Sequence, residues 1–193
     1  DGDPGECCLR ALPLYEWKEM EDKMKLAVGS DQAGYELKEK VKAYLLEKGH
    51  EVEDLGTTDV QAPLPYFEAA HNVCCRIREG GAERGFLICG TGAGMCIHAN
   101  KHQGIFAVVS ESVYSARLCR IINDANVLTF GSRIVPADMA YEMADVFIKT
   151  EFIEGMGPER AEHLMGQQQR YLELERSFCK GAADKEVGHE IQR

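Results

Sequence analysis

The order of apolar and polar positions along the chain predicts short strands that alternate with helices. Strand-like segments occur at Lys25–Gly29, Glu51–Leu55, Phe86–Cys89, Gly104–Val109 and Val127–Phe130. Apolar residues recur at helical spacing in the segments between and after them, namely Tyr35–Lys48, Tyr66–Glu79, Gly94–Lys101, Ser112–Ile121 and Ala137–Lys149. Strands that alternate with helices of these lengths are typical of a doubly wound sheet. We therefore predict a Rossmann-like, three-layer α/β/α fold with a five-stranded parallel sheet.

The pattern also divides the chain. The alternation occupies residues 23–166, which are expected to form one domain with a single core, because a chain of 193 residues is long enough to bury one. Residues 1–22 precede it as an extension, and residues 167–193 follow as a polar, charged tail. Within the tail, Tyr171 to Phe178 is expected either to form a helix against a partner subunit or to fray as a terminus.

Charge and cysteine usage narrow the classes of function. The net charge of -10 argues against a nucleic acid or an anionic membrane as partner. Apolar runs are too short for a membrane span, and no signal-peptide pattern opens the chain. The cysteine pairs Cys7-Cys8 and Cys74-Cys75 are adjacent, and C-x-x-C spacing is absent, so we expect reduced thiols in the cytoplasm and no zinc site.

Candidate chemistry is concentrated in the stretch Arg84–Lys101, which is predicted to be a strand, a glycine loop and a helix. Cys89 ends the strand, and Gly90, Gly92 and Gly94 follow it. Ligands of open α/β sheets bind at this end of the strands. The loop amides favour negative charge and could hold an oxyanion, so Cys89 is a candidate for acid–base work; the alternative is a small buried residue. The loop does not have the G-x-G-x-x-G spacing of a dinucleotide site.

The sequence L-I-C-G-T-G-A-G-M followed by H-A-N-K resembles the central motif of the ribose-5-phosphate isomerase B family. Further stretches agree in order with that family: V-G-S-D-Q-A-G from Val28, Y-S-A-R-L from Tyr114, N-D-A-N-V-L from Asn123, and G-S-R from Gly131. The resemblance covers residues 24–160. It implies interconversion of an aldose phosphate and a ketose phosphate through a cis-enediolate, with no cofactor and no metal.

The resemblance also assigns roles to single residues. Cys89 matches the family's base, which moves a proton between adjacent carbons, and Thr91 matches a hydroxyl that assists at the sugar oxygens. The expected substrate-binding residues are Asp31, Gln32, the loop residues Gly90, Gly92, Ala93 and Gly94, then Asn123, Arg133 and Arg160. Asp31 has the alternative role of a helix N-cap, and Asn100 and Lys101 are expected to be structural.

Several positions depart from the family pattern. Ile122 stands where the family has a histidine that opens the furanose ring, Gln32 replaces another histidine, and Gly157 lies where the first phosphate-binding arginine is expected. A four-carbon sugar with a terminal phosphate cannot close a furanose ring, and family relatives that act on tetrulose phosphates resemble this chain in lacking the histidine. The resemblance as a whole implies conversion of ribose 5-phosphate to ribulose 5-phosphate, and these losses suggest a tetrose 4-phosphate as the alternative substrate.

Two further hypotheses remain open. The chain could be a ribose-5-phosphate isomerase that opens the ring with another group, for which His98 is a candidate, or that uses the open-chain sugar. It could also be a non-catalytic sugar-phosphate-binding subunit, although it keeps both Cys89 and Thr91. Because family members have sites between subunits, a homodimer or tetramer is expected. Tyr66 is a weak substitute for a tyrosine that the family has near residue 64.

Overall fold

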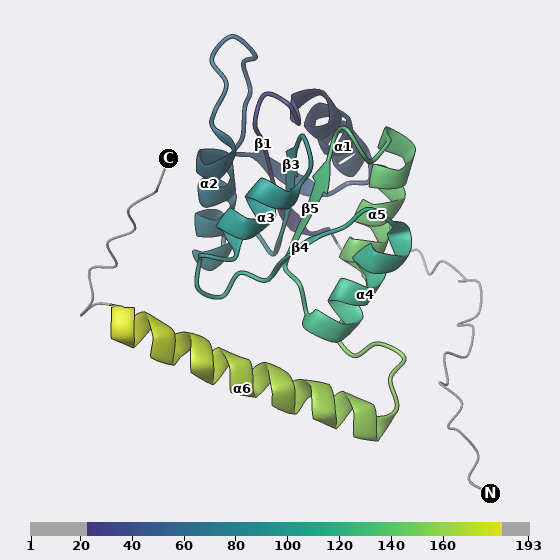
Figure 1. Cartoon of the computed structure of the whole chain (residues 1–193). Coiled ribbons are helices and arrows are strands. Elements are labelled where there is room, and N and C mark those ends of the chain that lie inside the picture. The colour runs from purple at the N-terminus through teal and green to yellow at the C-terminus, as the bar shows by residue number, and fades with distance from the viewer. Residues whose placement is uncertain (1–22, 183–193) are drawn as a thin grey trace, which may run out of the picture.

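A computed structural model describes residues 23–182, and these form one parallel sheet with helices on both faces (Figure 1). The strands are β1 (Lys25–Ser30), β2 (Glu51–Asp54), β3 (Arg84–Cys89), β4 (Ala107–Val109) and β5 (Val127–Gly131). Their order across the sheet is β2-β1-β3-β5-β4, and every neighbouring pair is parallel. This confirms the predicted five-stranded, doubly wound sheet.

The two faces of the sheet carry separate cores because successive strand residues point to opposite sides. Phe86 and Ile88 of β3 pack with the helices α1 (Tyr35–Glu47), α4 (Val113–Asn123) and α5 (Ala137–Lys149). Leu87 and Cys89 pack on the other side with α2 (Tyr66–Arg78) and α3 (Ala93–Ala99). The result is the expected α/β/α sandwich, with α2 and α3 toward the left of the sheet in Figure 1 and α4 and α5 toward its right.

The predicted elements agree with the observed ones except at a few ends. The largest difference is β4, which begins at Ala107 rather than Gly104. Gly104 adopts a left-handed φ of 78°, and the amide of Ile105 donates to the carbonyl of His102, so these residues form a turn. The apolar run there therefore includes part of a turn as well as the strand.

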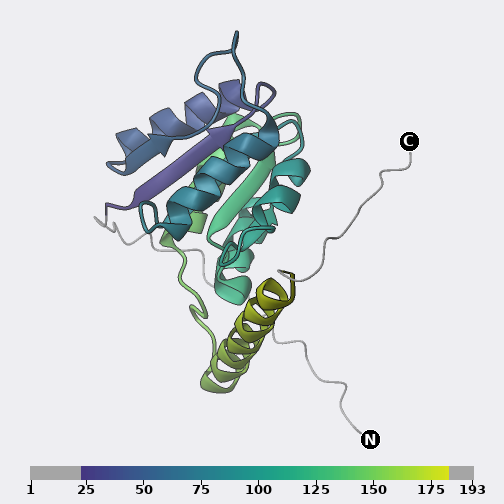
Figure 2. The same cartoon turned by 90° about the vertical axis from the view of Figure 1, so that its left-hand side faces the viewer.

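A long final helix, α6 (Pro158–Ala182), was not predicted as a continuous element. It runs through residue 166, so the predicted boundary between the domain and the tail is not a structural boundary. Figures 1 and 2 show α6 below the body of the domain, along the edge where the strands begin. Leu164 is buried against that edge, Gln168 donates to Asp124, and Tyr171 makes an edge contact with Phe106. The predicted extension 1–22 lies outside the described residues, as do residues 183–193.

Within the described residues 23–182, no helix is both long and apolar enough to cross a membrane.

Candidate active site

Three loops meet at the edge of the sheet where the strands end. They follow β1 (residues 31–34), β3 (residues 90–92) and β5 (residues 132–133). The amide of Ser132 donates to the carbonyl of Cys89 at 2.8 Å, and the Ser132 hydroxyl donates to the carbonyl of Ala33 at 2.7 Å. The turn after β5 thus ties the other two loops together around Cys89.

Glycines allow this close approach. A Cβ atom at Gly34 would lie 2.0 Å from the carbonyl oxygen of Ile88, and one at Gly131 would lie 2.6 Å from the Cα of Thr91. Gly92 has a left-handed φ of 79°, and a Cβ there would lie 2.8 Å from the Cα of Phe130. Side chains at these positions would push the three loops apart.

Cys89 lies at the centre of this arrangement. The residue is 6% exposed, and its Sγ accepts a hydrogen bond from the amide of Gly92 at 3.1 Å. Thr91 is exposed beside it, and the loop continues through Ala93 and Gly94 into α3. The Cys89 thiol, Thr91 and the loop amides therefore belong to one short loop, as the sequence predicts.

Arg133 and the β1 loop complete this side of the site. The amide of Arg133 donates to the carbonyl of Gly90. The Arg133 guanidinium lies beside Gly90, because a Cβ atom at Gly90 would be 3.5 Å from its Nε. Asp31 accepts from the amide of Gly34 at 2.9 Å, so its carboxylate caps the turn that leads into α1, while the N-cap residue of the helix itself is Gly34. Gln32 is exposed and lines an open cavity of about 470 Å³.

Asn123 and Arg160 lie at the opposite edge of the sheet, away from these loops. Asn123 is the last residue of α4, just before β5 begins, while Cys89 pairs with Gly131 at the end of β5. β5 is five residues long, so its two ends lie about 13 Å apart at 3.3 Å per residue. Arg160 is exposed on the first turn of α6. Asn123 and Arg160 therefore do not join Cys89 within one chain, which fits the expectation of a site between subunits.

Asn123 instead lines a second cavity, of about 360 Å³, between α6 and the beginning of β4. Ile122, which occupies the position of the family's ring-opening histidine, lines the same cavity beside Asn123. Asn100 also lines it and holds Ala107 through both backbone groups, with its Oδ1 accepting from the amide and its Nδ2 donating to the carbonyl. These bonds support the structural role expected for Asn100.

The two substitute residues lie in different surroundings. The ring of Tyr66 packs against Gly94 at the start of α3, so it borders the Cys89 loop. His98 lies further along α3, where its ring contacts Phe67 and His102. Partial burial and the neighbouring His102 and His71 lower its pKa below the usual value for histidine. His98 is therefore placed with other histidines rather than with Cys89.

Sequence reasoning missed the parts played by Ser132, Gly34 and Gly131. All three occur in quoted motif stretches, but their roles depend on which loops touch, and only the strand order fixes that. Fold and site together define a class: a doubly wound α/β protein with a cysteine, a threonine and a glycine loop at the carboxyl edge of its sheet.

Comparison with known proteins names the family within that class. The family described as Ribose/Galactose Isomerase matches residues 26–164, and the chain belongs to this family of sugar isomerases. A 4-deoxy-4-sulfo-D-erythrose isomerase of Clostridium sp. (strain MSTE9) is 48% identical over 157 residues, covering 81% of this chain and 99% of the relative. A ribose-5-phosphate isomerase B of Escherichia coli (strain K12) is 40% identical over 147 residues, covering 76% and 97%.

Solved structures agree with the fold. A crystal structure of a ribose 5-phosphate isomerase from Thermotoga maritima matches with a TM-score of 0.66 and 42% identity, covering 73% of this chain and 97% of that one. The resemblance inferred from the motifs is confirmed, and the chain is an aldose–ketose isomerase.

Proposed function

We propose that this isomerase acts on an open-chain, four-carbon aldose with an anionic group on its terminal carbon. The observation that carries the proposal is Ile122, which can neither donate nor accept a proton where the family's ring-opening histidine is expected. Without a hydroxyl at C4, a four-carbon sugar cannot close a furanose ring, so its isomerase has no ring to open.

The similarity to the sulfo-erythrose isomerase supports this substrate class. Its substrate carries a sulfonate bound to C4. A sulfonate has a single negative charge, whereas a phosphate ester carries about -1.5 to -2 at neutral pH. Gln32 and Gly157 replace cationic residues of the family pattern. A site with fewer cations suits the less charged group, and we favour a terminal sulfonate over a phosphate.

The chemistry follows from the loop geometry. The Cys89 thiolate removes the proton from C2 of the aldose, which leaves a cis-enediolate. The O2 hydroxyl proton passes to O1 beside the Thr91 hydroxyl, and the Cys89 thiol returns a proton to C1, which gives the ketose and restores the thiolate. No oxidant is needed, because electrons move only within the sugar. The loop amides and Thr91 stabilise the developing oxyanion, and Arg133 pairs with the terminal anion.

We infer that a second copy of the chain completes the site. Asn123 and Arg160 lie at the edge where the strands begin, which the Cys89 loop of the same chain does not reach. In a symmetric dimer, the Asn123 edge of one copy can face the Cys89 edge of the other. The exposed apolar side chains of Met165 and Leu174 on α6 are available for such a contact.

We also infer a reducing, cytoplasmic location. The mechanism requires a free Cys89 thiol, and all five cysteines of residues 23–177 are free. Thiols of this kind persist in the reducing cytosol.

D-ribose 5-phosphate is the second candidate substrate. The 40% identity to the Escherichia coli enzyme favours it. It would require a different ring-opening group or the small open-chain fraction of the sugar, because Ile122 cannot serve.

The experiment is a substrate panel with purified protein: 4-deoxy-4-sulfo-D-erythrose, D-erythrose 4-phosphate and D-ribose 5-phosphate. We expect kcat/KM to be highest for the sulfonate and lowest for the pentose. Equal or faster turnover of D-ribose 5-phosphate would overturn the proposal.

A matched pair of cysteine variants tests the base. Cys89→Ala should lower kcat by about 10²- to 10⁴-fold, the usual contribution of a general base. Cys96→Ser changes a half-buried thiol of α3 outside the loop and should retain activity. If Cys89→Ala keeps more than a tenth of the activity, another group is the base.

A further inference from the structure

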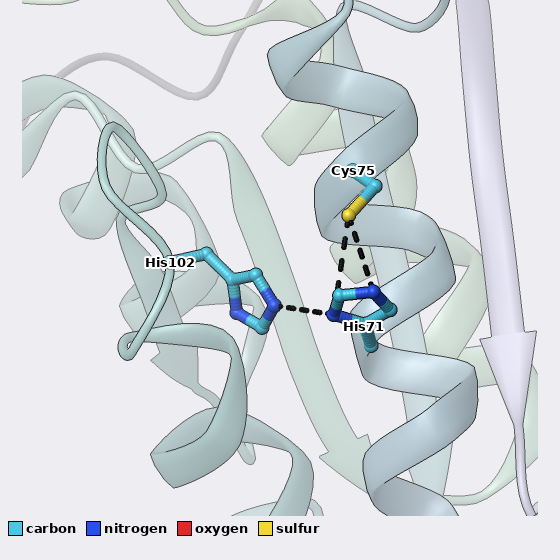
Figure 3. Close-up of side chains that lie close together, drawn as sticks. All are labelled: His71, Cys75 and His102. Carbon is cyan, nitrogen blue, oxygen red and sulfur yellow. Dashed lines mark hydrogen bonds between the residues drawn. The ribbon is translucent and has the colours of Figure 1, made fainter.

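A second cluster of reactive side chains lies where α2 faces the turn after α3. It consists of His71 and Cys75, one turn apart on α2, and His102 in the turn after α3 (Figure 3). One ligand atom from each residue lies within 4.8 Å of the others. The three side chains point toward one another, and we call them the His71–Cys75–His102 cluster.

The distances fit a bound metal ion after small side-chain adjustments. The Nδ1 of His71 is 2.9 Å from the Nε2 of His102 and 3.9 Å from the Sγ of Cys75. In a tetrahedral zinc site with bonds of about 2.0–2.1 Å to nitrogen and 2.3 Å to sulfur, ligand atoms are about 3.3 Å (nitrogen to nitrogen) and 3.6 Å (nitrogen to sulfur) apart. The observed values lie within about half an ångström of these.

One ligand is already oriented for metal. The Nδ1 of His102 lies 3.3 Å from the carbonyl oxygens of His98 and Ala99, to which it can donate its proton. That bond leaves Nε2, which faces His71, as the unprotonated nitrogen. Histidines that bind metals usually have their other ring nitrogen fixed in this way.

The donor set selects the kind of ion. A thiolate and two imidazoles suit zinc and similar borderline-soft ions, whereas calcium and magnesium prefer oxygen. His71 is exposed and the other two residues are half-buried, so the fourth position can be taken by water. The ligands come from α2 and from the turn after α3, so the ion would fasten these two elements together.

The cluster is separate from the isomerase site. Tyr66, which borders the Cys89 loop, stands at the first turn of α2, and His71 and Cys75 lie five and nine residues further along, about 7.5 and 13.5 Å at 1.5 Å per residue. We propose that His71, Cys75 and His102 form a zinc-binding site that joins α2 to the turn after α3 and takes no part in isomerisation. This departs from the expectation, based on cysteine spacing alone, that the chain has no zinc site.

The test is a titration of chelator-treated, reduced protein with Co²⁺, which reports thiolate ligation through a charge-transfer absorption band. We expect one Co²⁺ per chain, displacement of the band by one equivalent of Zn²⁺, and a Zn²⁺-dependent rise in Tm. Cys75→Ser should remove the band. His71→Ala should weaken Zn²⁺ binding by at least about 100-fold, the upper end of what outer-shell changes cost.

Control variants separate this site from other thiols and histidines. Cys89→Ala, Cys96→Ser and His163→Ala, which changes an exposed histidine of α6, should each keep the band and the Tm rise. Retention of the band in Cys75→Ser, or its loss in Cys89→Ala, would overturn the proposal. So would the absence of Co²⁺ binding in the wild-type chain. None of these readouts depends on the identity of the sugar.

Discussion

At the residue scale, the position of Cys89 depends on a backbone conformation that favours glycine. The amide that donates to its sulfur belongs to Gly92, whose φ is 79°. A side chain at Gly92 would also press on the backbone of Phe130. The loop geometry and the position of the proposed base are therefore coupled.

Gly92→Ala should destabilise the protein for two reasons, left-handed strain and overlap with Phe130. Strain alone costs about 1–2 kcal/mol for a residue with a Cβ. Gly104→Ala is the matched control, because Gly104 has nearly the same φ, 78°, but nothing within 4 Å of its Cβ position. Chemical denaturation should show a larger loss of unfolding free energy for Gly92→Ala. Equal losses would mean that the overlap is relieved without cost.

At the element scale, a buried lysine joins α1 to β2 and the loop after it. Lys38 is fully buried, and its Nζ lies 2.6 Å from both a carboxylate oxygen of Asp54 and the carbonyl oxygen of Thr57. Burial alone would raise the pKa of Asp54, but hydrogen bonds from Lys38 and Lys42 outweigh it and hold this pKa below its usual value. The ionised pair thus belongs to the folded state.

The pair predicts a specific dependence of stability on pH. Because the pKa of Asp54 is lower in the folded chain than the unfolded value of about 3.9, its contribution is complete above that value and is lost as the pH falls through the folded pKa. Asp54→Asn should cost about 2–3 kcal/mol at neutral pH, because Lys38 loses one partner but keeps Glu39. Denaturation curves below pH about 4 should then show the wild type losing stability more steeply than the variant.

The control for this prediction is Glu53→Gln on the same strand. Glu53 pairs with Arg76 on the surface, where both side chains are about 40% exposed, and such pairs contribute less than about 1 kcal/mol. If the two substitutions cost the same, the buried pair does not stabilise β2 as proposed.

The separation of Cys89 from Asn123 gives a test of the shared site. Cys89→Ala and Asn123→Ala should each be nearly inactive alone. After mixing and subunit exchange, half of the dimers combine the two variants and each has one intact site, so activity should recover to about a quarter of wild type. Enzyme assays before and after exchange measure this recovery.

Cys89→Ala mixed with Thr91→Ala is the matched control. Both substitutions lie in the same loop, so every site in the mixed dimer keeps one defect and no recovery is expected. Recovery in this control, or none in the first pair, would contradict a site shared between copies.

At the scale of the whole molecule, the sequence predicted the sheet and five helices but not α6. Leu164, Gln168, Tyr171 and Glu175 of α6 contact the body of the domain, and their spacing is helical. Two of the four are polar and bind through hydrogen bonds. The contact face therefore carries no apolar period that could be recognised in the sequence.

The sequence also predicted only part of the candidate site, because some of its features depend on packing rather than on local sequence. Cys89, Thr91 and the glycine loop are adjacent in sequence, so local motifs reveal them. The distance between Cys89 and Asn123 depends on the strand order and on the direction of α4, which composition and spacing do not give. The His71–Cys75–His102 cluster joins residues 31 positions apart, and only the packing of α2 against α3 brings them together.

The central claim, that this isomerase is built for an open-chain four-carbon substrate, is tested most directly at Ile122. The measurement is the ratio of kcat/KM for 4-deoxy-4-sulfo-D-erythrose to that for D-ribose 5-phosphate, in the wild type and in Ile122→His. We predict a high ratio in the wild type and a lower one in the variant, because the new imidazole can transfer the proton that opens the furanose ring. A wild-type ratio near or below one, unchanged by the substitution, would contradict the claim.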